Sequence, residues 1–204
     1  MEKAIAASSA QSRVRSIVFV AIAIALTAAC SMVTVPLGPI PFTLQNFAIS
    51  FTVLALKPKE AVAAIAGYLL LGAIGLPVFA GFAGGFSKLL GPTGGFLWGY
   101  LIGGIIAVSI LAAVRKTKGG KSIVAPKGTR WQQVLLSAGW EMMAMLVLIC
   151  IIDACGCLQY MALYQVDFLA AFLVCAAPFL VVDICKAIAA IVCAQAVKAA
   201  LPTK

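Results

Sequence analysis

Histidine is absent from the 204 residues of this sequence, and its absence removes several kinds of catalytic site. Serine peptidases of the Ser-His-Asp type need a histidine as general base, and most catalytic zinc sites use histidine as a ligand. The segment GFSKL at 85–89 also lacks the second glycine of a nucleophile elbow. Ser87 beside Lys88 is the one remaining candidate for a catalytic pair, and we do not expect an enzyme.

Motifs of nucleotide, nucleic-acid and metal chemistry are missing as well. The sequence has no GxxxxGK[ST] phosphate-binding loop, so any ATP hydrolysis must come from a partner. It has no Lys/Arg tract interleaved with aromatic residues, which argues against nucleic-acid binding. Its seven cysteines lie mostly in apolar runs, and the ACGC at 154–157 has one residue between the two cysteines where zinc motifs have at least two. We therefore expect no metal, no cofactor and no disulfide framework.

Charge is scarce too, since charged residues make up 10% of the chain while hydrophobic residues make up 64%. The mean hydropathy is +1.13, far above that of soluble domains. Several uncharged runs approach the roughly 20 residues that cross a bilayer as a helix. The apolar runs and the helix-breaking residues between them predict six spans, at 14–33, 42–56, 60–76, 92–114, 131–157 and 177–199. The expected fold is all-α, with residues 1–204 forming one six-helix, multi-pass membrane domain.

The basic residues predict the orientation of these spans. Of the 15 Lys and Arg residues, 13 fall before or at the start of the first span, at or after the end of the last, or in the connections 57–59 and 115–130. Cytoplasmic loops are enriched in Lys and Arg, so this face is predicted to be cytoplasmic. Both termini, the tail 1–13 and the basic loop 115–130 then lie inside the cell. Lys88 and Lys186 are the two exceptions.

The connections on the opposite face are apolar and rich in helix breakers. TVPLGPIPF at 34–42 has three prolines, and the segment 75–95 has seven glycines. Such segments cannot form continuous helix, and non-helical backbone at membrane depth is tolerated where it is buried in protein or lines a cavity. They are either ordinary external loops or, as their apolarity favours, loops that fold back over a site.

A charged pair lies in the last span. Asp183 and Lys186 are three residues apart, which places them on one face of a helix. Charges inside a membrane are costly and are candidates for a functional site. The pair could instead only fix helix packing, but Lys88 is predicted on the same side of the membrane. The three charges together favour a pocket.

Three segments resemble a known family: VPLGPIPFTLQNFA at 35–48, GYLLLGAIGLPVFAGFAGGFSKLLGPTGGFLWGYLIG at 67–103, and PFLVVDICKAIAA at 178–190. They resemble the BioY family, the biotin-binding membrane subunits of energy-coupling factor (ECF) transporters. The resemblance covers most of the chain from the first span onward. It implies a six-helix subunit of the bacterial plasma membrane that captures biotin from outside. Its partners would be a transmembrane coupling subunit and two ATP-hydrolysing subunits.

The resemblance also implies a binding site. Asp183 and Lys186 match the residues that hold the ureido head of biotin, and Lys88 matches a basic position for the carboxylate. The segment 41–45, with Thr43 and Gln45, matches a loop that covers the ligand. Biotin's apolar body needs apolar walls, which small-molecule pockets usually provide. The candidate wall residues are Tyr68, Phe79, Phe82 and Phe86.

A candidate partner surface lies on the first span. Ala21, Ala25 and Ala29 follow one another at a spacing of four, a small-xxx-small stripe that lets another helix approach closely. The resemblance implies that the approaching helix belongs to the coupling subunit. The alternative is that the stripe packs against another span of the same chain.

Some alternatives stay open from the sequence. The chain could be a stand-alone biotin carrier or facilitator, although no inverted repeat with broken helices is visible. It could also bind another small vitamin. Glu141, Asp153 and the cysteine-rich stretch 150–157 match no family pattern; Asp153, near the external end of its span, could simply be solvated.

Overall fold

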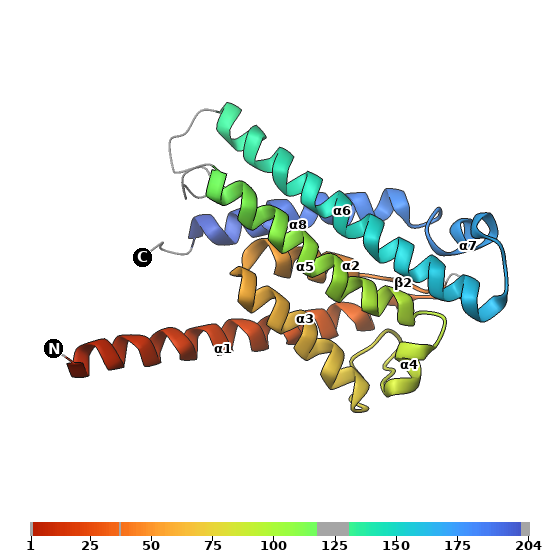
Figure 1. Cartoon of the computed structure of the whole chain (residues 1–204), viewed down its shortest axis with the longest axis horizontal. Helices are drawn as coiled ribbons and strands as arrows, with labels where there is room; N and C mark the ends of the chain where they lie inside the picture. Colours follow the sequence, from red (N-terminus) through yellow and green to blue (C-terminus); the bar gives the residue numbers. More distant parts are fainter. Residues whose placement is uncertain (1, 37, 118–130, 201–204) are drawn as a thin grey trace.

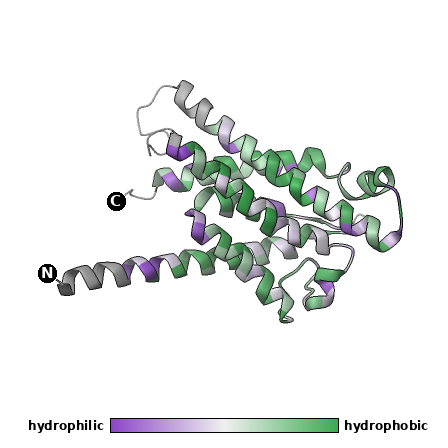
Figure 2. Ribbon diagram, in the orientation of Figure 1, coloured by the Kyte–Doolittle hydropathy of each residue, from purple (hydrophilic) through white to green (hydrophobic). Residues whose placement is uncertain are grey.

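The computed structural model describes residues 2–36, 38–117 and 131–200, and this part of the chain is mostly helical (Figure 1). Four helices are long and apolar enough to cross a membrane. They are α1 (Glu2–Met32), α5 (Gly94–Thr117), α6 (Trp131–Tyr164) and α8 (Leu180–Ala200). In the coloured parts of these helices in Figure 2, apolar residues predominate beyond the polar start of α1. The chain is therefore a mostly helical membrane protein.

Two further helices correspond to the short predicted spans. Helix α2 (Gln45–Ala55) has 11 residues and α3 (Pro58–Ala73) has 16. At 1.5 Å per residue they cover about 16 and about 24 Å, less than the hydrocarbon core of a bilayer. Helix α2 packs against α8, and its Ile49 and Leu54 are completely buried, so it ends within protein.

The sequence reasoning missed several short elements. Helices α4 (Phe86–Leu90) and α7 (Phe168–Cys175) lie in segments predicted as connections, and strands β1 (Thr34–Val35) and β2 (Phe42–Thr43) contradict a strictly all-α fold. A search for spanning runs overlooks such elements because they are too short to cross a bilayer. The tail 1–13 is also helical from residue 2 onward, and α6 runs seven residues past the predicted end of its span. Most of the predicted loop 115–130, residues 118–130, lies outside the described residues.

Helices α5 and α6 pack closely because α5 presents a row of glycines. Gly95, Gly99 and Gly103 follow at a spacing of four, and a Cβ atom on any of them would collide with α6. At Gly99 it would lie 2.7 Å from the Cα atom of Ile152. Small residues at this spacing allow two helix backbones to approach. Near the end of α6, Gln159 lies within hydrogen-bonding distance of the carbonyl oxygens of Leu89 and Gly91 at the end of α4.

The short elements gather at one end of the bundle. Strands β1 and β2 pair antiparallel, with Thr34 opposite Thr43 and Val35 opposite Phe42. This pair lies with α4 and α7 at the right in Figure 1, whereas the starts of α1 and α3 and the end of α8 lie at the left. The non-helical segments therefore meet at a single end, and a cavity opens between them.

Candidate functional site

A cavity of about 300 Å³ lies among these segments. Its volume is at the lower end of the roughly 300–1,000 Å³ of small-molecule pockets. Its lining combines an apolar wall with four charged side chains. The apolar wall includes Ile40, Phe42, Phe79, Phe96, Leu97 and Phe179; the charged side chains are Lys88, Asp153, Asp183 and Lys186. The cavity thus brings together charges from α4, α6 and α8.

The pair predicted on α8 lines this cavity. Asp183 and Lys186 keep only 3% and 8% of their surface exposed, and Lys186 Nζ donates a hydrogen bond of 2.8 Å to Asp183 Oδ1. The same ammonium lies 4.0 Å from the centre of the Phe42 ring, a cation–π distance. Among the described residues, Asp183 Oδ2 accepts no hydrogen bond. That oxygen is available to a ligand.

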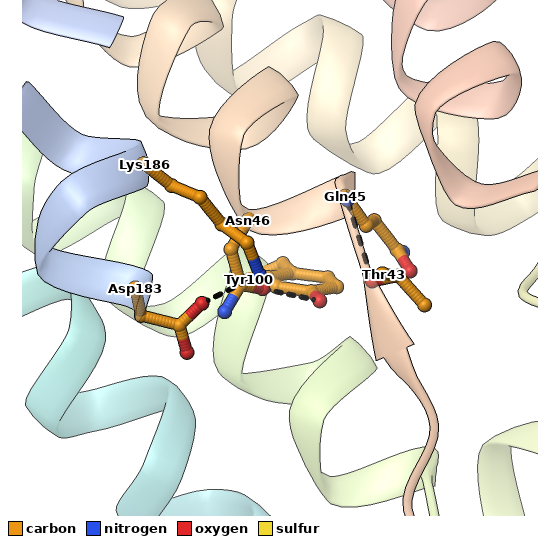
Figure 3. Close-up of polar contacts among 6 residues, drawn as sticks. All are labelled: Thr43, Gln45, Asn46, Tyr100, Asp183 and Lys186. Atoms are coloured by element: carbon orange, nitrogen blue, oxygen red, sulfur yellow. Dashed lines mark hydrogen bonds and ion pairs between the residues drawn. The ribbon is translucent and has the colours of Figure 1, made fainter. Parts of the chain in front are cut away.

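A second polar contact on the cavity wall was not predicted. Tyr100 on α5 donates from its hydroxyl to Asn46 Oδ1 on α2, at 2.7 Å, and both residues line the cavity beside Asp183 and Lys186 (Figure 3). A buried tyrosine hydroxyl usually finds a partner, so a tyrosine inside an apolar span was the available signal. The bond leaves the Asn46 amide nitrogen as a possible donor.

Tyr68 of α3 holds the segment 41–45 in place. Gln45 Nε2 donates to the Tyr68 hydroxyl at 2.9 Å, and that hydroxyl donates to the carbonyl oxygen of Val78, also at 2.9 Å. The Thr43 hydroxyl accepts from the Gln45 backbone N–H at 3.3 Å. Thr43 and Gln45 line the cavity (Figure 3), while Tyr68 lies behind it and packs edge-on against Phe79. Tyr68 supports the wall of the cavity.

The glycine-rich segment contributes only part of what was predicted. Lys88 and Phe79 line the cavity, but Phe82 and Phe86 do not and are 66% and 58% exposed. For Phe86 the unforeseen helix α4 explains this difference, because residues two apart on a helix, such as Phe86 and Lys88, face different directions. The expectation that Phe82 and Phe86 form the pocket wall does not agree with this structure.

The two unassigned acids of α6 have different surroundings. Asp153 is half-buried and lines the cavity, so it adds a second carboxylate to the site. Glu141 is 1% exposed, lies outside the lining, and accepts hydrogen bonds from Lys198 Nζ at 3.2 Å and Gln195 Nε2 at 3.0 Å. Asp153 therefore belongs to the cavity, and Glu141 to a buried ion pair between α6 and α8.

The arrangement suits one kind of ligand. Asp183 and Asp153 accept hydrogen bonds, Lys186 and Lys88 donate them, and the aromatic wall receives an apolar body. A small molecule with polar groups, an apolar middle and a negative charge would satisfy all of these groups. The fold and this cavity define a multi-helix membrane protein with a small-molecule binding site at one end.

Comparison with known proteins gives the family. The BioY family model matches residues 2–203, so the chain belongs to the BioY family. The probable biotin transporter BioY of Pyrococcus horikoshii is 32% identical over 183 residues, which cover 90% of this chain and 96% of that protein. The biotin transporter BioY of Thermotoga maritima is 42% identical over 103 residues, which cover 50% of this chain and 60% of that protein.

A solved structure has the same fold. The crystal structure of the S-component for biotin from an ECF-type ABC transporter superposes with a TM-score of 0.78. The match covers 92% of this chain and 93% of that chain, at 22% sequence identity. The chain therefore has the fold of such an S-component.

Proposed function

We propose that this chain is the membrane subunit that captures biotin for an ECF-type transporter. It is a binding and transport subunit of the plasma membrane and does not alter its ligand chemically. The observation that carries the proposal is the buried pair Asp183–Lys186, which faces a small cavity in a chain of the BioY family. Relatives named as biotin transporters support the choice of ligand.

The chemistry of biotin matches the cavity group by group. Its ureido N–H groups would donate to the free Oδ2 of Asp183, and Lys186 would donate to the ureido carbonyl. The bicyclic ring and alkyl chain would lie against the aromatic wall, and Lys88 would meet the carboxylate through a charge-assisted bond. The segment 39–46 and the α4 segment, both part of the lining, would cover the bound molecule.

The charge distribution supports the proposed orientation in the membrane. Lys57, Lys59, Arg115 and Lys198 belong to helix ends that lie together at the left of the bundle in Figures 1 and 2. The positive-inside rule places that end in the cytoplasm and the cavity toward the outside. In this arrangement all six of α1, α2, α3, α5, α6 and α8 form the transmembrane domain, and both termini are cytoplasmic.

The proposed partner surface on α1 faces away from the other helices. Ala21, Ala25 and Ala29 are exposed, whereas Ala23 and Thr27 on the same helix are buried against the bundle. The outward orientation favours docking of another protein over packing within the chain. We propose that the coupling subunit, with two ATP-hydrolysing subunits, docks there.

Equilibrium binding to the purified chain tests the proposal. Radiolabelled biotin should bind saturably, unlabelled biotin should compete, and other vitamins such as thiamine and pantothenate should not. Preferential binding of another vitamin would contradict biotin as the ligand. Reconstitution into liposomes without partners addresses the stand-alone alternative, because a binding subunit should then bind biotin without accumulating it, whereas a carrier should transport it.

A further inference from the structure

The short helix that carries Lys88 is held by a side chain from α6. Gln159 Nε2 donates one hydrogen bond to the carbonyl oxygen of Leu89, at 3.1 Å, and a second to that of Gly91, at 2.7 Å. Trp98 on α5 donates from its indole nitrogen to the same Leu89 carbonyl, at 3.2 Å. Both hydrogens of the Gln159 amide are therefore used on the C-terminal end of α4.

The surrounding backbone is shaped to admit this amide. A Cβ atom on Gly94 would lie 2.5 Å from Gln159 Nε2 and would overlap the Leu89 carbonyl oxygen. A Cβ atom on Gly95 would lie 2.9 Å from the Cβ of Gln159. Two successive glycines at the start of α5 thus leave the space in which the amide reaches α4.

Helix α4 has few other attachments. It has five residues, and isolated helices of that length are not stable in water. Leu89 is its only buried side chain, at 3% exposed, whereas Phe86 and Leu90 are 58% and 59% exposed. The position of α4 therefore depends on Leu89 and on the hydrogen bonds to its C-terminal carbonyls.

We propose that Gln159 is a positioning residue that holds α4 so that Lys88 faces the cavity and meets the anionic group of the ligand. The inference rests on the proposed function, in which Lys88 binds the carboxylate of biotin. A lysine loses considerable rotamer freedom when it is fixed on a ligand, so its bond is strongest when the backbone beneath it is already held in place. Gln159 touches α4 and is absent from the cavity lining.

The test removes the hydrogen bonds and keeps the length of the side chain. Gln159→Met should weaken binding of biotin about three- to tenfold, the size typical of coupled neighbours. Biotinamide, which has no carboxylate for Lys88 to meet, should bind the variant within about twofold of wild type. Gln165→Met is the matched control. Gln165 directly follows α6, is exposed, and donates a hydrogen bond to the Ala162 carbonyl oxygen at 2.9 Å, away from α4.

A double variant separates positioning from a general structural effect. If Gln159 acts through Lys88, then Gln159→Met in a Lys88→Ala background should change biotin affinity less than about twofold, because the coupled interaction is already lost. Thermal unfolding with biotinamide bound confirms that each variant is folded.

Three results would overturn the inference. Equal weakening of biotin and biotinamide by Gln159→Met would show a loss of the cavity as a whole. An undiminished effect in the Lys88→Ala background would show that Gln159 acts elsewhere. If Lys88→Ala itself weakens both ligands equally, Lys88 does not bind the carboxylate, and that part of the proposed function fails together with the inference.

Discussion

Replacing Asp183 by asparagine removes a negative charge from the centre of the proposed site and leaves the shape of the side chain almost unchanged. Asp183 is 3% exposed and its Oδ1 lies 2.8 Å from Lys186 Nζ. The substitution removes the negative charge that the ureido N–H groups would meet and presents an amide that can offer a competing donor. We expect binding of biotin to weaken by about 2–4 kcal/mol, or roughly thirty- to a thousandfold.

The substitution also lowers the stability of the fold, and that loss is not part of the change in binding free energy. Without the carboxylate, Lys186 loses its ion pair with residue 183, in the free and in the bound protein alike. That loss lowers the stability of both states and largely cancels in the affinity. Stability and affinity must therefore be measured separately.

Titration calorimetry on the purified variant measures the affinity, and a thermal unfolding curve measures the stability. Asp167→Asn is the matched control, because Asp167 is an exposed N-cap of α7 and asparagine caps a helix equally well. The control should bind biotin like wild type. An Asp183→Asn variant that binds biotin within about threefold of wild type would refute the reasoning, since a lost charged contact costs more than that.

Three further predictions concern other parts of the molecule. Ala25→Trp should abolish co-purification of the coupling subunit without changing biotin affinity; loss of affinity with the complex intact would indicate packing within the chain. Lys198→Met should leave Glu141 as a buried, poorly compensated charge and lower the free energy of unfolding, measured by denaturant titration, by about 3 kcal/mol. Adding Glu141→Gln to the Lys198→Met variant should restore part of the lost stability. Engineered cysteines at 116–128 should resist an impermeant thiol reagent added outside intact cells, and their labelling would reject the proposed orientation.

The features that could be predicted from the sequence are those determined by residues close together in the chain. Four long helices were predictable from the length and hydropathy of their apolar runs, because a segment that crosses a bilayer must be a long apolar helix. The pair Asp183–Lys186 was also predictable, because a spacing of three on a helix brings two side chains together whatever else the chain does.

The remaining features depend on tertiary packing between distant segments. Tyr100 meets Asn46 across 54 positions of sequence, and Gln159 reaches Leu89 across 70. No periodicity in the sequence signals such pairs. Phe86 was misplaced for a related reason. Whether Phe86 or Lys88 faces the cavity depends on α4, a helix too short for its sequence to predict.

Glu141 shows the same limit of sequence reasoning. Its position in an apolar span marked it as unusual, but its partners Lys198 and Gln195 lie on α8, more than fifty residues away. Sequence alone could not separate a buried ion pair from a site that needs an external ligand. Its place outside the cavity lining and its two bonds distinguish it from Asp153.

The central claim is that biotin binds in the cavity between α4, α6 and α8, and a structure of the chain crystallised with biotin tests it most directly. We predict ligand density inside the cavity, with the ureido ring within hydrogen-bonding distance of Asp183 and Lys186 and the carboxylate at Lys88. Biotin bound elsewhere on the chain, or bound in the cavity with its carboxylate at Lys186 and its ureido ring at Lys88, would contradict it.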